Sequence, residues 1–224
     1  IITGPTGAGK TTTFHYLIDL INSERRAKII TIEDPIEYTQ VSKRSVIIQQ
    51  EVLTDVRDFK SALTHVLRQD PDVIGIGEMR DPETIFTALV AAETGHLVIA
   101  TLHTPDTIQV VERIVSAFSE GQHAMVRHML ANTLQGVIAQ QLIPSAIEDK
   151  RVLCYEILMG TPAVRANIRE NEVHKLYSTI QLGRKFQMMT MDQNLLELYQ
   201  QGEISYDSAV SMAKYPEAVK KRTE

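Results

Sequence analysis

One glycine-rich segment near the beginning of the chain limits its fold more than any other feature. Residues Gly4 to Thr11 read Gly-Pro-Thr-Gly-Ala-Gly-Lys-Thr and fit G-x-x-x-x-G-K-[ST] at every fixed position. An apolar run, Ile1–Thr3, precedes the segment, and a helical pattern, Lys10–Asn22, follows it. A strand, this loop and a helix in that order form the context in which the motif binds phosphate.

The residue types of the loop explain its chemistry. Glycines let the backbone curl until several N–H groups point inward at phosphate oxygens, and the N-terminus of the following helix adds a favourable dipole. We expect Lys10 to reach the terminal phosphates and the Thr11 hydroxyl to bind Mg²⁺. The predicted nucleotide-binding residues are Gly4, Pro5, Thr6, Gly7, Ala8, Gly9, Lys10, Thr11 and Thr12.

Short apolar runs alternate with helical patterns over the first two thirds of the chain. The strand-like runs are Ile1–Thr3, Lys28–Ile32, Val46–Gln49, Asp72–Ile76 and Leu97–Thr101. Helical patterns cover 10–22 and 56–68, and Asp-Pro at 81–82 and Thr-Pro at 104–105 are start signals for two more helices. This alternation predicts an α/β fold with a mostly parallel sheet and helices on both faces.

The remaining third of the chain has fewer strand signals. We expect one long helix over 122–141, ended by Pro144, then a strand over 151–158 and several short amphipathic helices. The polar stretch 145–150 is the expected junction. The sequence therefore predicts an α/β core over residues 1–145 and a mostly helical C-terminal subdomain over residues 151–224.

Composition excludes several classes of protein. Lys and Arg total 23 against 28 Asp and Glu, so the formal net charge is −5, which argues against a nucleic-acid partner bound through its backbone. The single cysteine, Cys154, excludes an internal disulfide and a cysteine zinc module and favours a reducing compartment. No apolar run reaches the roughly 18 residues of a membrane span. Because the chain begins inside an apolar run, we expect an upstream strand or domain.

A second acidic element follows a later strand. Within residues Val73 to Asp81, an apolar run ends at the acid Glu78. Phosphate-binding α/β proteins place such an acid at the carboxyl end of a strand next to the loop. We therefore expect Glu78 to hold the attacking water or the Mg²⁺ shell. Asp81 is better interpreted as the N-cap of the next helix.

Two further segments carry candidate residues after strands. Between Thr31 and Tyr38, Glu33, Asp34 and Glu37 place three acids in five residues, a pattern that a nearby cation or a polar strand exit would each explain. Glu33 and Asp34 are possible metal ligands, and Glu37 is a candidate catalytic acid. His103 ends another strand-like run, where it is either a γ-phosphate sensor or a structural histidine.

The four segments together resemble the secretion ATPase superfamily. Residues 4–11, 31–38, 73–81 and 95–104 are similar to its Walker A, Asp, Walker B and His boxes, in the same order. Residues 163–171 also resemble the A-I-R-N-L-I-R-E segment of the PilT type of pilus retraction motor, and 188–193 resemble its M-Q-T-M-D/N-Q stretch. Interpreted without the family, 163–171 is only a basic amphipathic helix with a solvated face.

The resemblance implies a RecA-like P-loop ATPase core followed by a helical C-terminal subdomain. It implies a motor that hydrolyses ATP with Mg²⁺ to retract type IV pili in twitching motility. The family works as a homo-hexameric ring, cytoplasmic and peripheral to the inner membrane, on a platform protein at the pilus base. Glu78 would activate water, Glu37 would be the main Asp-box acid, and His103 would sense the γ-phosphate. The implied partner and motion residues are Arg165, Asn167, Arg169 and Glu170.

Some positions depart from the family pattern. Nothing here represents the family's N-terminal PAS-like domain, which supplies arginines to the nucleotide site. The family's H-T-N reads His103-Thr104-Pro105, and its Q-R-L reads Gln140-Gln141-Leu142, so one arginine is missing. Arg80 is expected to be occupied by nearby acids such as Asp81. The sequence therefore supports nucleotide binding more strongly than rapid hydrolysis.

Other functions remain open at this point. A pilus-assembly or type II secretion ATPase would share the core, although many of these carry a four-cysteine zinc module. A small-molecule kinase would need an arginine-rich lid, and a nucleic-acid translocase would need a basic stripe; neither stands out. A regulator that binds nucleotide without hydrolysing it is a further alternative, and turnover measurements would distinguish it.

Overall fold

The computed structural model describes residues 1–223, so Glu224, the last residue of the predicted subdomain, lies outside the described residues. The chain forms two compact units. The first unit consists of Ile1–Ile2, Lys10–Leu102 and Glu112–Leu134. The second consists of Thr3–Gly9, His103–Val111 and the chain from Gln135 onward. The glycine-rich loop therefore belongs to the second unit, and the helix that follows it belongs to the first.

The first unit is built on a parallel sheet of four strands in the order β3–β2–β4–β5. The strands are β2 (Lys28–Glu33), β3 (Val46–Glu51), β4 (Val73–Ile76) and β5 (Leu97–Ala100). Each lies within two residues of the run that predicted it. Because the strands run in the same direction, their carboxyl ends meet at one edge of the sheet.

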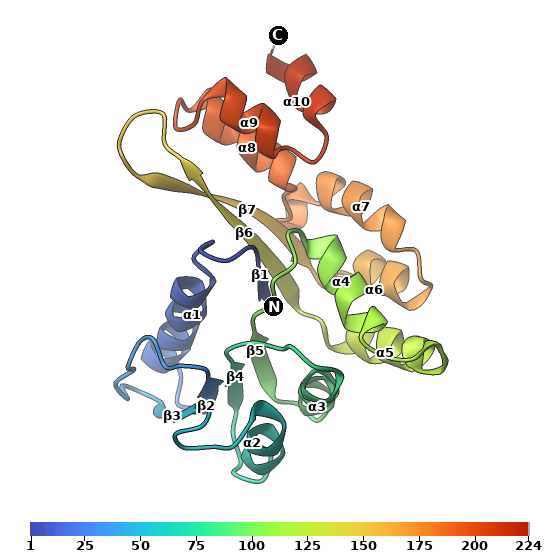
Figure 1. The fold of residues 1–224 in the computed structure, drawn as a ribbon. Helices are drawn as coiled ribbons and strands as arrows, with labels where there is room; N and C mark the ends of the chain where they lie inside the picture. The colour runs from blue at the N-terminus through green and yellow to red at the C-terminus, as the bar shows by residue number, and fades with distance from the viewer. Residues whose placement is uncertain (224) are drawn as a thin grey trace. The chain divides into compact units, whose positions relative to one another are not determined.

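Helices cover both faces of this sheet. The helix α1 (Lys10–Glu24) lies on one face, and α2 (Phe59–Val66) and α3 (Pro82–Glu93) lie on the other (Figure 1). Alternate strand residues explain the two layers, because successive side chains point to opposite faces. Phe14 and Ile18 of α1 pack with Ile29, Val73 and Ile99. The intervening residues Ile30, Ile74 and Ile76 are fully buried as well. The predicted α/β class is confirmed.

The second unit is built on a long antiparallel pair of strands. These are β6 (Gly136–Pro144) and β7 (Arg151–Met159), and with β1 (Ile2–Thr3) they form a sheet in the order β1–β6–β7. The helices that follow are α6 (Pro162–Arg169), α7 (Leu176–Leu182), α8 (Met191–Gln200), α9 (Tyr206–Met212) and α10 (Pro216–Thr223). The C-terminal part is therefore mostly helical, as predicted.

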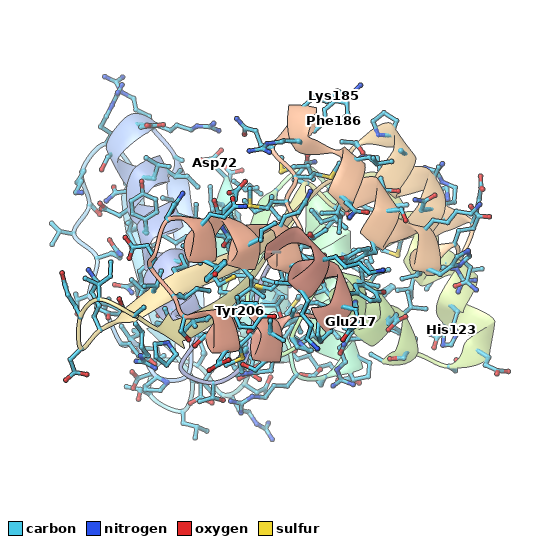
Figure 2. The ribbon with its side chains drawn as sticks, turned by 90° about the horizontal axis from the view of Figure 1, so that it is seen from above. Asp72, His123, Lys185, Phe186, Tyr206 and Glu217 are labelled. Carbon is cyan, nitrogen blue, oxygen red and sulfur yellow. The ribbon has the colours of Figure 1, made fainter. Side chains whose placement is uncertain are left out.

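The core of the second unit lies between the strand pair and the C-terminal helices. Its buried residues are Ala139, Ile143, Cys154, Met191, Leu195, Ile204, Ala209 and Val219. Figure 2 looks onto these helices and labels Tyr206 at the start of α9 and Glu217 in α10. It also labels Lys185 and Phe186 in a short 3₁₀ turn, where the Lys185 ammonium lies 4.9 Å from the centre of the Phe186 ring.

Two predicted helices exist, but their predicted bounds are wrong. The helix expected over 122–141 is α5 (Glu120–Thr133) followed by β6, because Leu134 is extended and the next residues pair with β7 along its whole length. The helix expected from Thr104-Pro105 is α4 (Thr107–Ser116), which begins two residues later. Its cap is Asp106, whose carboxylate accepts the Gln109 N–H at 2.7 Å. The cap predicted at Asp81 is confirmed by the Thr84 N–H bond at 2.8 Å.

Residues 145–150, the expected junction, form the loop between the paired strands β6 and β7. The functional division into a core of residues 1–145 and a subdomain from residue 151 stays a prediction. The chain passes between the two compact units after residues 2, 9, 102, 111 and 134. Within residues 1–223, no helix is long and apolar enough to cross a membrane.

Candidate active site

The glycine-rich loop lies in the second unit, and its glycines are needed for its path. Gly7 and Gly9 have φ values of +79° and +85°, a region that residues with a Cβ rarely adopt. Gly4 packs so closely on β6 that a Cβ there would clash with the Gln140 carbonyl oxygen. The Ala8 N–H donates to the Pro5 carbonyl at 3.2 Å and closes the turn. The loop therefore has the curled backbone that the motif predicts.

The first turn of α1, in the first unit, continues the motif. Lys10 is buried, and burial lowers the pKa of its ammonium while the charge of Glu78 raises it in part. Thr11 is half-buried and Thr12 is exposed. The first turn of α1 contains no acidic residue, so no carboxylate of that turn offsets the positive end of the helix dipole. This helix start is suited to an anion.

Glu78 lies just beyond β4 and is held by an arginine. A terminal nitrogen of Arg80 is 2.7 Å from a carboxylate oxygen of Glu78, and the guanidinium is also 3.9 Å from Asp34. The hydrogen bond to Glu78 is the main cause that raises the pKa of Arg80. The expectation that nearby acids occupy Arg80 is confirmed, but the acids are Glu78 and Asp34 and not Asp81, which caps α3.

Glu33, at the end of β2, is surrounded by donors. Its carboxylate accepts from the Thr31 hydroxyl at 2.6 Å and the Gln49 amide at 3.0 Å, and it lies 3.1 Å from the ring of His15. Burial raises the pKa of Glu33, but the hydrogen bonds from His15, Thr31 and Gln49 outweigh burial, so the pKa lies below its ordinary value. With both oxygens engaged, Glu33 is ill-suited to bind a metal directly.

The other Asp-box acids are placed differently. Asp34 and Glu37 are exposed in the loop between β2 and β3. Gln49 fixes this loop by accepting the Gln40 N–H at 2.7 Å and donating to the Tyr38 carbonyl at 2.9 Å. Asp34 and Glu37 are therefore accessible at the end of the sheet where Glu78 also lies.

The donors present fit one kind of magnesium site. Among residues 1–223 there is no group of three or more His, Cys, Asp or Glu side chains that could hold a metal. Mg²⁺ is commonly bound by one or two carboxylates, water and substrate phosphates, without an all-protein cage. The Thr11 hydroxyl and an accessible acid such as Asp34 fit a magnesium ion of that kind, which arrives with a nucleotide.

His103 lies in the second unit and is exposed. The residue after it is tied to the strand that leads into the glycine-rich loop. The buried Thr3 hydroxyl donates to the Thr104 carbonyl at 2.6 Å, and the two hydroxyl oxygens lie 2.9 Å apart. The predicted sensor segment and the start of the loop are therefore linked within one compact unit.

The predicted partner residues lie on and just after α6. Thr161 caps this helix, as its Thr-Pro signal predicts, and Val164 and Ile168 are buried. Arg165 is half-buried and donates to the Gly160 carbonyl at 2.8 Å. The exposed residues of the set are Arg169 and Glu170, whereas Asn167 donates to the Thr179 hydroxyl at 3.1 Å.

Sequence patterns missed several contacts of these residues. No local signal pairs His15 with Glu33, because the fold alone brings these separate segments together. For Arg80 and Glu78 the hint was local, since the two residues are neighbours but one in the sequence.

A parallel sheet together with a curled G-x-x-x-x-G-K-[ST] loop directly before α1 is the pattern of a P-loop α/β protein. A model of the family described as type II/IV secretion system protein matches residues 1–222, and the chain belongs to this family. The chain is 48% identical over 219 residues to a twitching motility protein of Neisseria gonorrhoeae. It is 48% identical over 217 residues to the type IV pilus retractation ATPase PilT of Pseudomonas aeruginosa.

A solved structure extends this likeness to the fold. The pilus retraction motor PilT with bound ADP matches with a TM-score of 0.92 and 47% identity, covering 98% of this chain and 62% of that one. The alignments to the two relatives cover 98% and 97% of this chain. The chain spans only 59% and 63% of their own lengths.

Proposed function

We propose that this chain is the ATP-hydrolysing part of a motor that retracts type IV pili and so drives twitching motility. The observation that carries the proposal is the complete glycine-rich loop at the start of α1, with Glu78 beyond β4. The likeness to relatives named for twitching motility and pilus retraction supports it. The reaction converts ATP and water to ADP and phosphate.

The residues of the chain have distinct tasks in this reaction. The backbone of Gly4–Gly9 binds phosphate oxygens, and the Lys10 ammonium neutralises charge that develops on the transferred group. Glu78, fixed on one side by Arg80, orients the attacking water. Mg²⁺, when bound with the nucleotide, supplies further charge neutralisation. The Thr11 hydroxyl and Asp34 would hold it, while Glu33 keeps the strand end in place.

The remaining predicted residues extend this scheme. Glu37 assists Glu78 as the accessible Asp-box acid, and His103 senses whether the γ-phosphate is present. An arginine finger also accelerates phosphoryl transfer, because it stabilises the charge of the transition state. Arg80 is engaged by Glu78, and Gln141 stands where the family has an arginine. We therefore propose that a neighbouring subunit or an upstream segment supplies this charge.

The proposed assembly is a homo-hexameric ring at the cytoplasmic face of the inner membrane. There it would dock on a platform protein of the pilus base, with no nucleic acid involved. Arg169 and Glu170 form the accessible part of the docking segment, and Arg165 and Asn167 shape it from within.

The test measures ATP turnover of the full-length protein. It also measures twitching of cells that lack their own copy of the gene and are supplied with the gene for this protein. Restored twitching together with ATP turnover is expected. Turnover with restored pilus assembly or secretion, but no retraction, would favour the related assembly and secretion ATPases. A protein that binds ATP but never hydrolyses it would overturn the proposal in favour of a regulator.

The docking segment needs a separate test. Arg169→Ala with Glu170→Ala should preserve ATP turnover and abolish twitching, because both side chains are exposed and belong to no part of the phosphate site. Lys175→Ala, which removes an exposed lysine paired with Glu172 at 2.6 Å, is the matched control. Normal twitching of the double variant would contradict the docking role.

A further inference from the structure

Three acids of the second unit are nearly or fully buried and saturated with donors. Asp106, Glu156 and Asp192 are 9%, 1% and 7% exposed. None belongs to the four boxes. A buried carboxylate is costly unless it is paired and hydrogen-bonded, so the contacts of these acids indicate what they hold together.

Glu156, on β7, holds the starts of two helices. One oxygen accepts the Thr107 N–H at 2.9 Å and the Thr107 hydroxyl at 2.6 Å. The other accepts the Met191 N–H at 3.2 Å. Thr107 begins α4 and Met191 begins α8, so one carboxylate satisfies unpaired N–H groups at both helix starts.

Asp192, in the first turn of α8, holds the segment between α9 and α10. Its two oxygens accept the Lys214 N–H at 2.7 Å and the Tyr215 N–H at 3.0 Å. The Tyr177 hydroxyl of α7 donates to it as well, at 3.1 Å. Burial raises the pKa of Tyr177, and the charge of Asp192 and the hydrogen bond to it raise that pKa further. The backbone at Lys214 is therefore fixed relative to α7 and α8.

The Lys214 side chain extends from this fixed backbone to Asp106. Its ammonium lies 2.8 Å from an Asp106 oxygen and 5.8 Å from the Tyr177 ring centre. Asp106 uses its other oxygen to cap α4. Burial lowers the pKa of Lys214, but the pair with Asp106 more than compensates, and the pKa is raised.

This ion pair joins segments that are 108 residues apart. Partly buried ion pairs are weak sources of stability, because desolvation offsets the attraction, and fixing one arrangement is a better attested role. Asp106 lies three residues after His103, and Thr104 between them is bonded to Thr3 at the entry to the glycine-rich loop. The segment from His103 to Thr107 is thus held at the loop on one side and at the C-terminal helices on the other.

We infer that Lys214 and Asp106 form a positioning pair that holds the His103–Thr107 segment on the C-terminal helices and couples the nucleotide state at His103 to α8, α9 and α10. The coupling rests on the proposed function. It is reciprocal, so whatever moves these helices also alters the site. Lys214 is a positioning residue in this scheme, because it acts on the segment through Asp106.

The test uses four variants of the full-length protein. Lys214→Met removes the charge and keeps most of the stem, and Lys214→Arg restores the charge. Asp106→Asn, made in the Lys214→Met background, keeps the cap of α4, because Asn caps as well as Asp. Lys150→Met is the matched control, since it removes an exposed lysine of the same unit that pairs with Glu148 at 3.0 Å.

Two measurements are made on each variant. Hydrogen exchange without nucleotide reports how firmly the first turn of α4 is held. Lys214→Met should speed exchange there and lower kcat by up to about 10²-fold with KM nearly unchanged, as for a slightly misplaced reacting group. Lys214→Arg should restore both values, and adding Asp106→Asn should cause no further loss in kcat.

The outcomes separate positioning from simple stabilisation. Unchanged exchange in Lys214→Met would overturn the positioning pair. Faster exchange with an unchanged kcat, or an equal loss in Lys150→Met, would overturn the coupling. If the parent protein hydrolyses no ATP, the proposed function fails, and the nucleotide-free exchange data alone decide whether the pair positions the segment.

Discussion

The acids of the two units are held in opposite ways. In the first unit, Asp34 and Glu37 are exposed at the end of the sheet, and Glu78 lies beside Arg80. In the second unit, Glu156 and Asp192 are buried and each accepts three hydrogen bonds from the protein. A carboxylate whose donors are accessible can exchange them for water, metal or substrate. One surrounded by protein donors serves the architecture.

Glu33 shows that position in a motif does not decide which kind an acid is. It belongs to the Asp box by sequence, yet it is buried and held by Thr31, Gln49 and His15. Its environment resembles that of Glu156 rather than that of Asp34. The comparison therefore predicts that variants of the accessible acids lose activity, whereas variants of the buried acids held by protein donors lose stability.

The largest effect is expected for Lys10→Ala. In the proposed function the Lys10 ammonium neutralises the transferred phosphoryl group, so kcat/KM of the variant should fall by roughly 10³–10⁵, as for an arginine with the same electrostatic task. Thermal stability should hold, because a buried lysine is desolvated at a cost. Steady-state ATP turnover and thermal unfolding measure the two effects. Lys43→Ala, which removes an exposed lysine paired with Asp19, is the control, and equal turnover in Lys10→Ala would show that the loop assignment is wrong.

Glu78→Gln should have the next largest effect. It keeps the shape of the side chain and removes the charge that we propose orients the attacking water, so kcat should fall by about 10²–10⁴ while nucleotide binding survives. Binding is measured by titration with a fluorescent nucleotide, alongside turnover. Glu83→Gln, at an exposed position of α3, should change neither. An equal loss of binding and turnover would instead assign Glu78 to Mg²⁺.

Glu156→Gln should lower stability, in contrast to the two preceding variants, which should lower activity. The amide replaces one acceptor by a donor that faces N–H groups, which should lower the free energy of unfolding by about 1–3 kcal/mol. The midpoint of thermal unfolding should fall by several degrees at roughly 2–4 °C per kcal/mol. Glu37→Gln is the exposed counterpart and should stay within about 0.5 kcal/mol of the parent. A stable Glu156→Gln variant would break the comparison between the two kinds of acid.

The smallest effect concerns pH. Burial raises the pKa of the Cys154 thiol to about 12, whereas an unfolded thiol ionises near its ordinary value of about 8.5. Between these values the unfolded chain binds fewer protons, so the free energy of unfolding falls as pH rises, by about 1 kcal/mol one unit above the ordinary value. Urea unfolding near pH 7 and near pH 9.5 measures this slope. Cys154→Ala should unfold with a smaller dependence on pH, and an identical slope would contradict the burial of the thiol.

Much of the first unit could be predicted because its signals are local. Each strand of the parallel sheet is a short apolar run, and Asp81 followed by Pro82 marks the start of α3. The loop at Gly4–Thr11 is also local, since positive φ at Gly7 and Gly9 and a helix start at Lys10 involve only neighbouring residues. The candidate site residues were therefore found from their places at the ends of strands.

The sequence by itself thus determined the α/β class, the curled glycine-rich loop and the positions of Glu78, Glu37 and His103 a few residues after predicted strands. Only the tertiary structure decided that the chain after Leu134 is a strand, because pairing with β7 outweighs helical periodicity. It also decided that Glu33 pairs with His15 and that Lys214 pairs with Asp106. Backbone preference and the spacing of apolar residues act within a few positions, whereas a buried charge finds its partner only when the folded chain brings distant segments together.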